Sequence, residues 1–126
     1  MRYELHFRDM KIGDVTEADA DFPNLWGTIT YDGSLQCPTS EEQKRLARFI
    51  ELNRDSIRLV DIEHEQDVSA ELDAINKELE AFDDYIETDD WLLITQEGET
   101  LPILCPILRH DGEIVWRWNP RESTGR

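Results

Sequence analysis

The chain has 126 residues, the length of one typical domain, and a formal net charge of −16. Its 39% hydrophobic content and four tryptophans exclude an ordinary disordered acidic chain, since such chains lack aromatic residues. The acidity disfavours binding to nucleic acid, and no run approaches the roughly 20 apolar residues that a membrane span requires. We therefore expect one domain over residues 1–120, followed by a flexible tail over 121–126.

The first 38 residues carry the signals of strands and turns. Tyr3, Leu5 and Phe7 alternate with polar or charged residues, which is the period-two pattern of a half-buried strand. Residues 10–16 indicate a short second strand, and residues 28–31 form a β-rich run.

Residues 39–97 contain neither glycine nor proline, although the chain has eleven such residues, and this predicts helices. A hydroxyl residue, Ser40, followed by Glu41 and Glu42, is typical of a helix start. The apolar spacing continues to about residue 62, where residues 57–62 fit either a helix or a strand.

A second helical segment has the clearest pattern. Its apolar residues recur at alternating spacings of four and three: Val68, Leu72, Ile75, Leu79, Phe82 and Ile86. The pattern predicts one unbroken helix that buries Leu72, Ile75, Leu79 and Phe82 in the core. Acids beside the stripe disfavour a symmetric coiled-coil dimer, because a partner helix would set acid against acid.

Residues 91–118 return to strand signals. Pro102 and Pro106 both lack an N–H on the same strand edge, so residues 101–108 must lie at a sheet edge or be split into two short strands. The expected fold is α+β: a predominantly antiparallel sheet from the N- and C-terminal strands, with two helical segments of about residues 39–88 packed on one face.

Negative charge is concentrated in residues 61–90, which hold thirteen acids and one base. Five of the acids lie at the C-terminal end of the predicted helix: Asp83, Asp84, Glu87, Asp89 and Asp90. Exposed anions at the negative end of a helix cost about 0.3 to 1 kcal/mol each at low salt. We interpret the five as a binding site for a basic protein. Fraying of the helix, or acidity suited to solubility or a salty cytoplasm, is the alternative.

Trp116 and Trp118 lie on the same face of the last predicted strand. They either pack in the core or, if exposed, provide an aromatic contact for a cationic partner.

No catalytic motif is recognisable. The histidines, His6, His64 and His110, have no partners at metal-ligand spacing, so we expect no metal site and no cofactor. Pairs of acids, such as Asp89 with Asp90, are candidates for a general acid and base, but spacing alone does not separate their pKa values.

The cysteines, Cys37 and Cys105, have no CxxC spacing and read as free thiols. The N-terminus alternates polar and apolar residues, unlike a signal peptide, which favours a cytoplasmic protein.

The sequence favours a non-enzymatic acidic protein-interaction domain, such as an inhibitor or adaptor that binds a basic protein. An enzyme that acts on a small molecule or uses a metal, with carboxylates as general acid and base, is the alternative. A pocket with convergent carboxylates, His6 or His110 would favour the enzyme, and a convex acidic face would favour the interaction domain.

Overall fold

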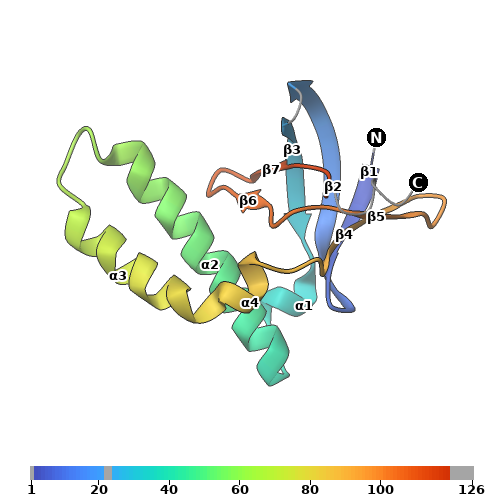
Figure 1. The fold of residues 1–126 in the computed structure, drawn as a ribbon, viewed down its shortest axis with the longest axis horizontal. Coiled ribbons are helices and arrows are strands. Elements are labelled where there is room, and N and C mark those ends of the chain that lie inside the picture. The colour runs from blue at the N-terminus through green and yellow to red at the C-terminus, as the bar shows by residue number, and fades with distance from the viewer. Residues whose placement is uncertain (1, 22–23, 120–126) are drawn as a thin grey trace.

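The computed structural model describes residues 2–21 and 24–119, and it contains one antiparallel sheet in the order β5-β4-β1-β2-β3-β7-β6 (Figure 1). The strands are β1 (Arg2–Phe7), β2 (Met10–Asp21), β3 (Asn24–Tyr31), β4 (Trp91–Thr95), β5 (Thr100–Pro102), β6 (Ile107–Leu108) and β7 (Glu113–Trp116). The helices between β3 and β4 are α1 (Gly33–Gln36), α2 (Glu41–Ile62), α3 (Ser69–Leu79), the 3-10 turn η1 (Glu80–Phe82) and α4 (Asp83–Ile86). The predicted α+β fold is confirmed, and the predicted tail over 121–126 lies outside the described residues.

A two-residue turn joins β1 to β2. Phe7 pairs with Met10, and the residues between them, Arg8 and Asp9, have φ angles of 48° and 67°. A hairpin turn this short favours positive φ at both central residues, because that backbone twist matches the twist of the strands. Neither residue is glycine, so the turn holds two side chains in a sparsely populated conformation.

The sheet curves until its two sides meet. Ile103, just after β5, forms a bridge with Trp118, just after β7. The Leu104 N–H donates to the Arg117 carbonyl oxygen at 3.0 Å, and the Asn119 N–H donates to the Pro102 carbonyl oxygen at 3.2 Å. The strands β2 and β3 approach closely at Gly27, where an added Cβ would lie 2.1 Å from the Thr16 carbonyl oxygen.

The two prolines act as predicted. The segment over residues 101–108 contains two short strands, of which β5 pairs with β4 and β6 pairs with β7.

The first helical segment is the single helix α2, so residues 57–62 are helical. It starts with a capping box: the Gln43 N–H donates to Ser40 Oγ at 3.1 Å, and Gln43 Oε1 accepts from the Ser40 N–H at 3.3 Å. Four of its buried side chains belong to the same core as the strands, namely Leu46, Phe49, Ile50 and Leu52, and Leu59 is buried outside that cluster.

The second helical segment is not one unbroken helix, and this prediction was wrong. α3 ends at Leu79, and the turn η1 separates it from the short α4. Phe82 is buried as predicted, but Leu72, Ile75 and Leu79 are only half-buried. The reason is that α3 packs mainly on α2, so only one side of the helix is covered. No side chain of α3 itself is buried, and Val68, which precedes it, is buried.

An aromatic cluster joins the sheet to α2 and α4. The Phe49 ring centroid lies 5.4 Å from that of Phe82 and 5.2 Å from that of Tyr85, while Phe7 lies 4.5 Å from both Tyr85 and Trp91. The Trp91 indole N–H donates to the Tyr85 carbonyl oxygen at 2.6 Å. The helices α2 and α3 project from the sheet (Figure 1), and this aromatic cluster fixes them to it.

In the described part of the chain, no helix combines the length and the apolar character that crossing a membrane requires.

Candidate functional site

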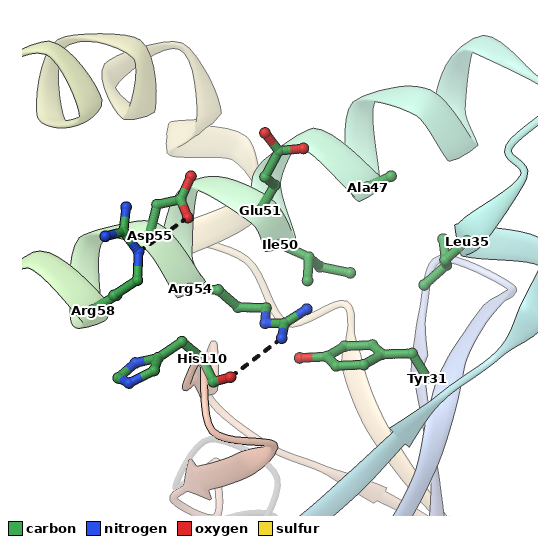
Figure 2. Close-up of a pocket in the computed structure, with 9 residues that line it drawn as sticks. All are labelled: Tyr31, Leu35, Ala47, Ile50, Glu51, Arg54, Asp55, Arg58 and His110. Atoms are coloured by element: carbon green, nitrogen blue, oxygen red, sulfur yellow. Dashed lines mark hydrogen bonds and ion pairs between the residues drawn. The ribbon is translucent and has the colours of Figure 1, made fainter.

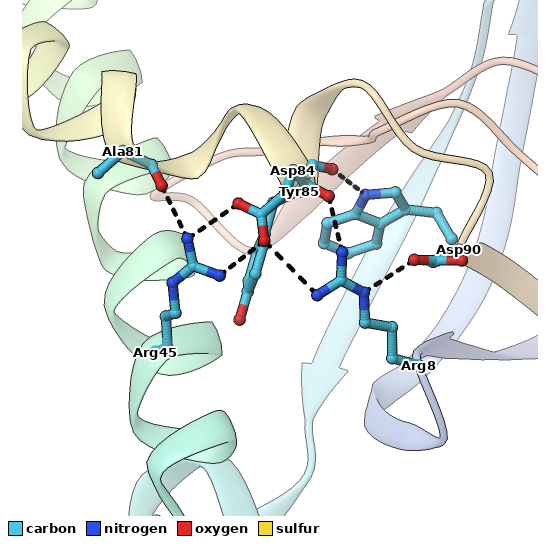
Figure 3. Close-up of polar contacts among 7 residues, drawn as sticks. Arg8, Arg45, Ala81, Asp84, Tyr85 and Asp90 are labelled. Atoms are coloured by element: carbon cyan, nitrogen blue, oxygen red, sulfur yellow. Dashed lines mark hydrogen bonds and ion pairs between the residues drawn. The ribbon is translucent and has the colours of Figure 1, made fainter.

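Asp84, one of the five predicted partner-binding acids, lies between two arginines (Figure 3). Arg45 of α2 donates from Nη1 and Nη2 to its two carboxylate oxygens at 2.8 and 2.9 Å, and Arg8 Nη1 lies 3.6 Å from Oδ2. The hydrogen bonds from Arg45 lower the pKa of the Asp84 carboxyl below its ordinary value. The charge of Asp84 is therefore compensated within the chain.

Asp90 is compensated in the same way. Arg8 Nε donates to Asp90 Oδ2 at 2.8 Å, and Arg8 Nη2 donates to the Asp84 carbonyl oxygen at 2.9 Å. The Arg8 guanidinium also lies over the rings of Phe7 and Tyr85, at 4.7 and 5.3 Å from their centroids. The hydrogen bond from Arg8 lowers the pKa of the Asp90 carboxyl.

The remaining three acids divide into two kinds. Asp89 Oδ1 accepts a hydrogen bond from Asn119 Nδ2 at 2.9 Å. Asp83 and Glu87 are exposed, and no hydrogen bond or ion pair of their side chains is found among the described residues. The structure thus leaves two of the five predicted acids uncompensated.

The proposed cost of placing these acids at a helix C-terminus does not apply to Asp83 and Asp84. Because α3 ends at Leu79 and η1 follows, both lie outside the last turn of α3, in the single-turn helix α4, whose dipole is small. The cost expected at the C-terminus of one long helix therefore does not arise in that form for these two residues.

The two tryptophans also differ. Trp116 is only 2% exposed and packs in the core, so it presents no surface to a partner. Trp118 is 37% exposed, and its ring packs edge-on against Tyr3 at a centroid separation of 6.4 Å. Of the pair, Trp118 alone remains available as an aromatic surface contact.

Other exposed carboxylates lie at the end of α2 and along the second helical segment. We define the acidic surface as six exposed acids whose side chains form no hydrogen bond or ion pair within the described ranges: Glu63, Glu71, Asp73, Glu80, Asp83 and Glu87. Nearby acids are compensated by contrast, since Arg48 donates to both carboxylate oxygens of Glu78 at 2.6 and 2.7 Å. Residues 59–76, which include the tip of the helix pair, contain no lysine or arginine.

A pocket of about 600 Å³ lies between α2, the end of β3 and the turn between β6 and β7 (Figure 2). It is lined by Tyr31, Leu35, Ala47, Ile50, Glu51, Arg54, Asp55, Arg58 and His110. Three buried polar atoms in it have no hydrogen-bond partner: Tyr31 Oη, Arg54 Nε and His110 Nδ1. Nothing in the sequence pattern singles out this combination, because its residues come from three separate segments.

The carboxylates of the pocket already have cationic neighbours. Glu51 Oε1 accepts from Arg48 Nη1 at 2.7 Å, and Asp55 Oδ1 lies 3.9 Å from Arg58 Nε. The pocket therefore offers hydrogen-bond donors more readily than a free general base.

The other predicted candidates for chemistry are dispersed. His6 Nε2 lies 3.1 Å from Glu4 Oε1, and His64 is exposed at the tip of the helix pair, so of the three histidines only His110 lines the pocket. Within the described residues, no group of three or more histidine, cysteine or acidic side chains is arranged to hold a metal ion.

Cys37 is exposed and Cys105 half-buried, and both are free thiols. Burial raises the pKa of the Cys105 thiol to about 12, which keeps it protonated and unreactive near neutral pH.

No protein-family model matches this chain, and no match is found among curated proteins or solved structures.

Proposed function

We propose that this chain is a non-enzymatic protein-interaction domain, such as an inhibitor or adaptor, that binds a basic protein through the acidic surface. One observation carries the proposal. Arginines of the chain compensate Glu78, Asp84 and Asp90, whereas the six acids of the acidic surface have no such partner among the described residues.

The position of these acids supports recognition. They extend from the C-terminus of α2, where Glu63 lies, along α3 to the end of α4, and the pair of α2 and α3 projects from the sheet (Figure 1). These acids outnumber the one base of α3, Lys77, and a predominantly negative potential on a projecting element attracts an oppositely charged surface and raises its association rate. The partner would supply the lysines and arginines that residues 59–76 lack.

Trp118 is proposed as an aromatic contact at the border of this surface. Its neighbour Asn119 is hydrogen-bonded to Asp89, so the Trp118 segment adjoins the loop that follows Glu87. An exposed indole beside carboxylates is suited to a lysine or arginine of a partner, which can contact the ring face and the acids together.

The pocket favours binding over the enzyme alternative. Its two carboxylates lie against arginines, and the carboxylate nearest to His110, that of Asp61 at 3.8 Å from Nε2, accepts a hydrogen bond from Arg109 at 3.1 Å. The unpartnered groups of the pocket are those of Tyr31, Arg54 and His110. A general acid and base pair would need two carboxylates or a carboxylate and a histidine poised with separated pKa values around one substrate position.

The test is to isolate a partner by affinity capture at low salt and to measure its association with two charge-matched variants. The first removes three acids of the acidic surface (Glu71→Gln, Asp73→Asn, Asp83→Asn). The control removes three exposed acids elsewhere (Glu42→Gln, Glu97→Gln, Glu99→Gln). In both sets one or more residues lie in the first turn of a helix, so the effect on the helix dipole is similar.

We expect the first variant to associate more slowly and with a weaker salt dependence, while dissociation changes less. The control should associate like the wild type. If capture returns no basic protein, or if both variants slow association equally, the acids act only as a general charge and the proposal fails.

A further inference from the structure

We propose that the pocket between α2 and the turn joining β6 to β7 binds a small organic anion, a carboxylate or phosphate on an apolar body, through Arg54 and Tyr31. This site is separate from the acidic surface and goes beyond the proposed function.

Unpartnered polar atoms gather around this pocket. Among the described residues, four buried side-chain nitrogen or oxygen atoms lack a hydrogen-bond partner, and three of them line this one pocket. The fourth is the indole nitrogen of Trp116. Buried polar groups are nearly always hydrogen-bonded, so three exceptions around one cavity indicate a molecule that supplies their partners.

Two of these atoms are hydrogen-bond donors. Arg54 Nε is a permanent donor on a charged group, and the Tyr31 hydroxyl is a second donor. Together they suit an oxyanion, because charge-assisted hydrogen bonds from a guanidinium to a carboxylate or phosphate are among the strongest in proteins. The third atom, His110 Nδ1, adds a donor or an acceptor according to the proton positions on the ring.

The side chain of Arg54 is held in place by its neighbours. Its Nη2 donates to the His110 carbonyl oxygen at 3.3 Å, and its guanidinium carbon lies 5.3 Å from the centroid of the Tyr31 ring (Figure 2). The Nε atom has no partner among the described residues but is covered, so an anion reaches it only with a small shift of the surrounding side chains. A guanidinium already fixed in this way loses little conformational entropy when an anion binds.

The volume and the apolar wall of the pocket indicate what the rest of the ligand is. The volume of about 600 Å³ lies in the range typical of sites for small molecules. Leu35, Ala47 and Ile50 provide an apolar wall. An inorganic ion would leave this wall uncovered, so the ligand carries an apolar group beside its charge.

The test is calorimetric titration with four probes: benzoate, phenyl phosphate, inorganic phosphate and benzyl alcohol. We expect benzoate or phenyl phosphate to bind at least about tenfold more tightly than neutral benzyl alcohol and inorganic phosphate. The comparison of benzoate with phenyl phosphate distinguishes the two anions.

Variants then assign the site. Arg54→Gln should weaken binding of the preferred probe at least about tenfold, and Tyr31→Phe severalfold. Arg2→Gln, which removes an exposed arginine elsewhere, should leave the affinity unchanged. The variant Glu71→Gln, Asp73→Asn, Asp83→Asn should also leave it unchanged, which separates this proposal from the proposed function.

Nuclear magnetic resonance of the wild-type protein provides a readout that needs no variant. The resonances of Tyr31, Arg54 and His110 should shift when the preferred probe is added. The proposal is overturned if neither organic anion binds, if the shifts lie elsewhere in the protein, or if folded Arg54→Gln binds the probe like the wild type.

Discussion

Arg45 on α2 holds Asp84 on α4 through hydrogen bonds of 2.8 and 2.9 Å. The same arginine donates to the Ala81 carbonyl oxygen at 2.7 Å and lies 4.6 Å from the centroid of the Tyr85 ring. Arg45 thus fixes the point where α3 gives way to α4, above the aromatic cluster. Asp84 belongs to an acidic segment whose sequence resembles a solvated helix end, but its carboxylate makes a structural contact with Arg45.

This contact predicts different effects for two neighbouring acids. Asp84→Asn should lower the free energy of unfolding by about 1 kcal/mol, the upper end for exposed ion pairs, since the pair is bidentate and a second arginine lies near. Asp83→Asn should leave stability nearly unchanged. Urea unfolding of both variants provides the measurement, and equal effects would contradict the assignment.

The same contacts predict a pH dependence of stability. Arginines lower the pKa values of Asp84 and Asp90 below their ordinary value of 3.8. Their contribution is therefore complete above the unfolded-state pKa and is lost as the pH falls through the lower folded-state values. The difference in urea midpoint between the wild type and Asp84→Asn should narrow below about pH 4 and vanish in stronger acid. A difference that stays constant to the lowest pH would refute this origin.

Gly27→Ala should strongly destabilise the sheet. The added Cβ would meet the Thr16 carbonyl oxygen at 2.1 Å, so β2 and β3 would have to move apart, at a cost of about 1 to 3 kcal/mol or more. The control is Gly33→Ala, where no atom lies within 4 Å of the added Cβ. Thermal unfolding should show a clear loss for the first variant and little or none for the second.

The stripe of the second helical segment should show graded losses. Phe82→Ala should cost about 3 to 5 kcal/mol, because the ring is buried between Phe49 and Tyr85. Leu79→Ala should cost less than about 2 kcal/mol, below the range expected for a fully buried leucine, because this side chain is only half-buried. A larger loss for Leu79 than for Phe82 in denaturant melts would show that the helix packs differently.

The two thiols should react at different rates. In the native protein Cys37 should react quickly with a thiol reagent at mildly alkaline pH, and Cys105 should react only after unfolding. Counting modified thiols by mass spectrometry before and after addition of urea checks this, with Cys37→Ser as the control that should leave no fast reaction.

Local rules predicted the parts of the fold that local physics determines. Alternation in β1, the hydroxyl cap at Ser40 and the missing N–H groups of Pro102 and Pro106 each led to the observed element. These features act within a few residues of the chain, so a single sequence contains the needed information.

The break at η1 was beyond such rules. Apolar spacings of three and four residues fit a continuous helix and equally fit a helix interrupted by a 3-10 turn, since the turn advances the chain by three residues. What selects the break is the placing of Phe82 and Tyr85 against Phe49, which is a tertiary contact.

The compensation of Asp84 and Asp90 was beyond local rules for a related reason. The partners of Asp84 and Asp90 are Arg45 and Arg8, which lie 39 and 82 residues away in the chain. The pocket likewise assembles Tyr31, Arg54 and His110 from β3, α2 and the turn before β7. Charge along a sequence reveals where acids gather but not which of them the fold compensates.

The meeting of the two sheet sides at Ile103 and Trp118 has a consequence for synthesis of the protein. The strands β1, β2 and β3 emerge first from the ribosome. The second neighbour of β1, which is β4, is made later, and the two sides of the sheet can be joined only when Trp118 is available. Contacts between such distant segments slow folding, because the chain entropy is lost before the contacts form. Until the last strands are made, the nascent chain can cover the apolar faces of its first three strands only in part, with side chains of α2, so we expect it to be most prone to aggregation in this period.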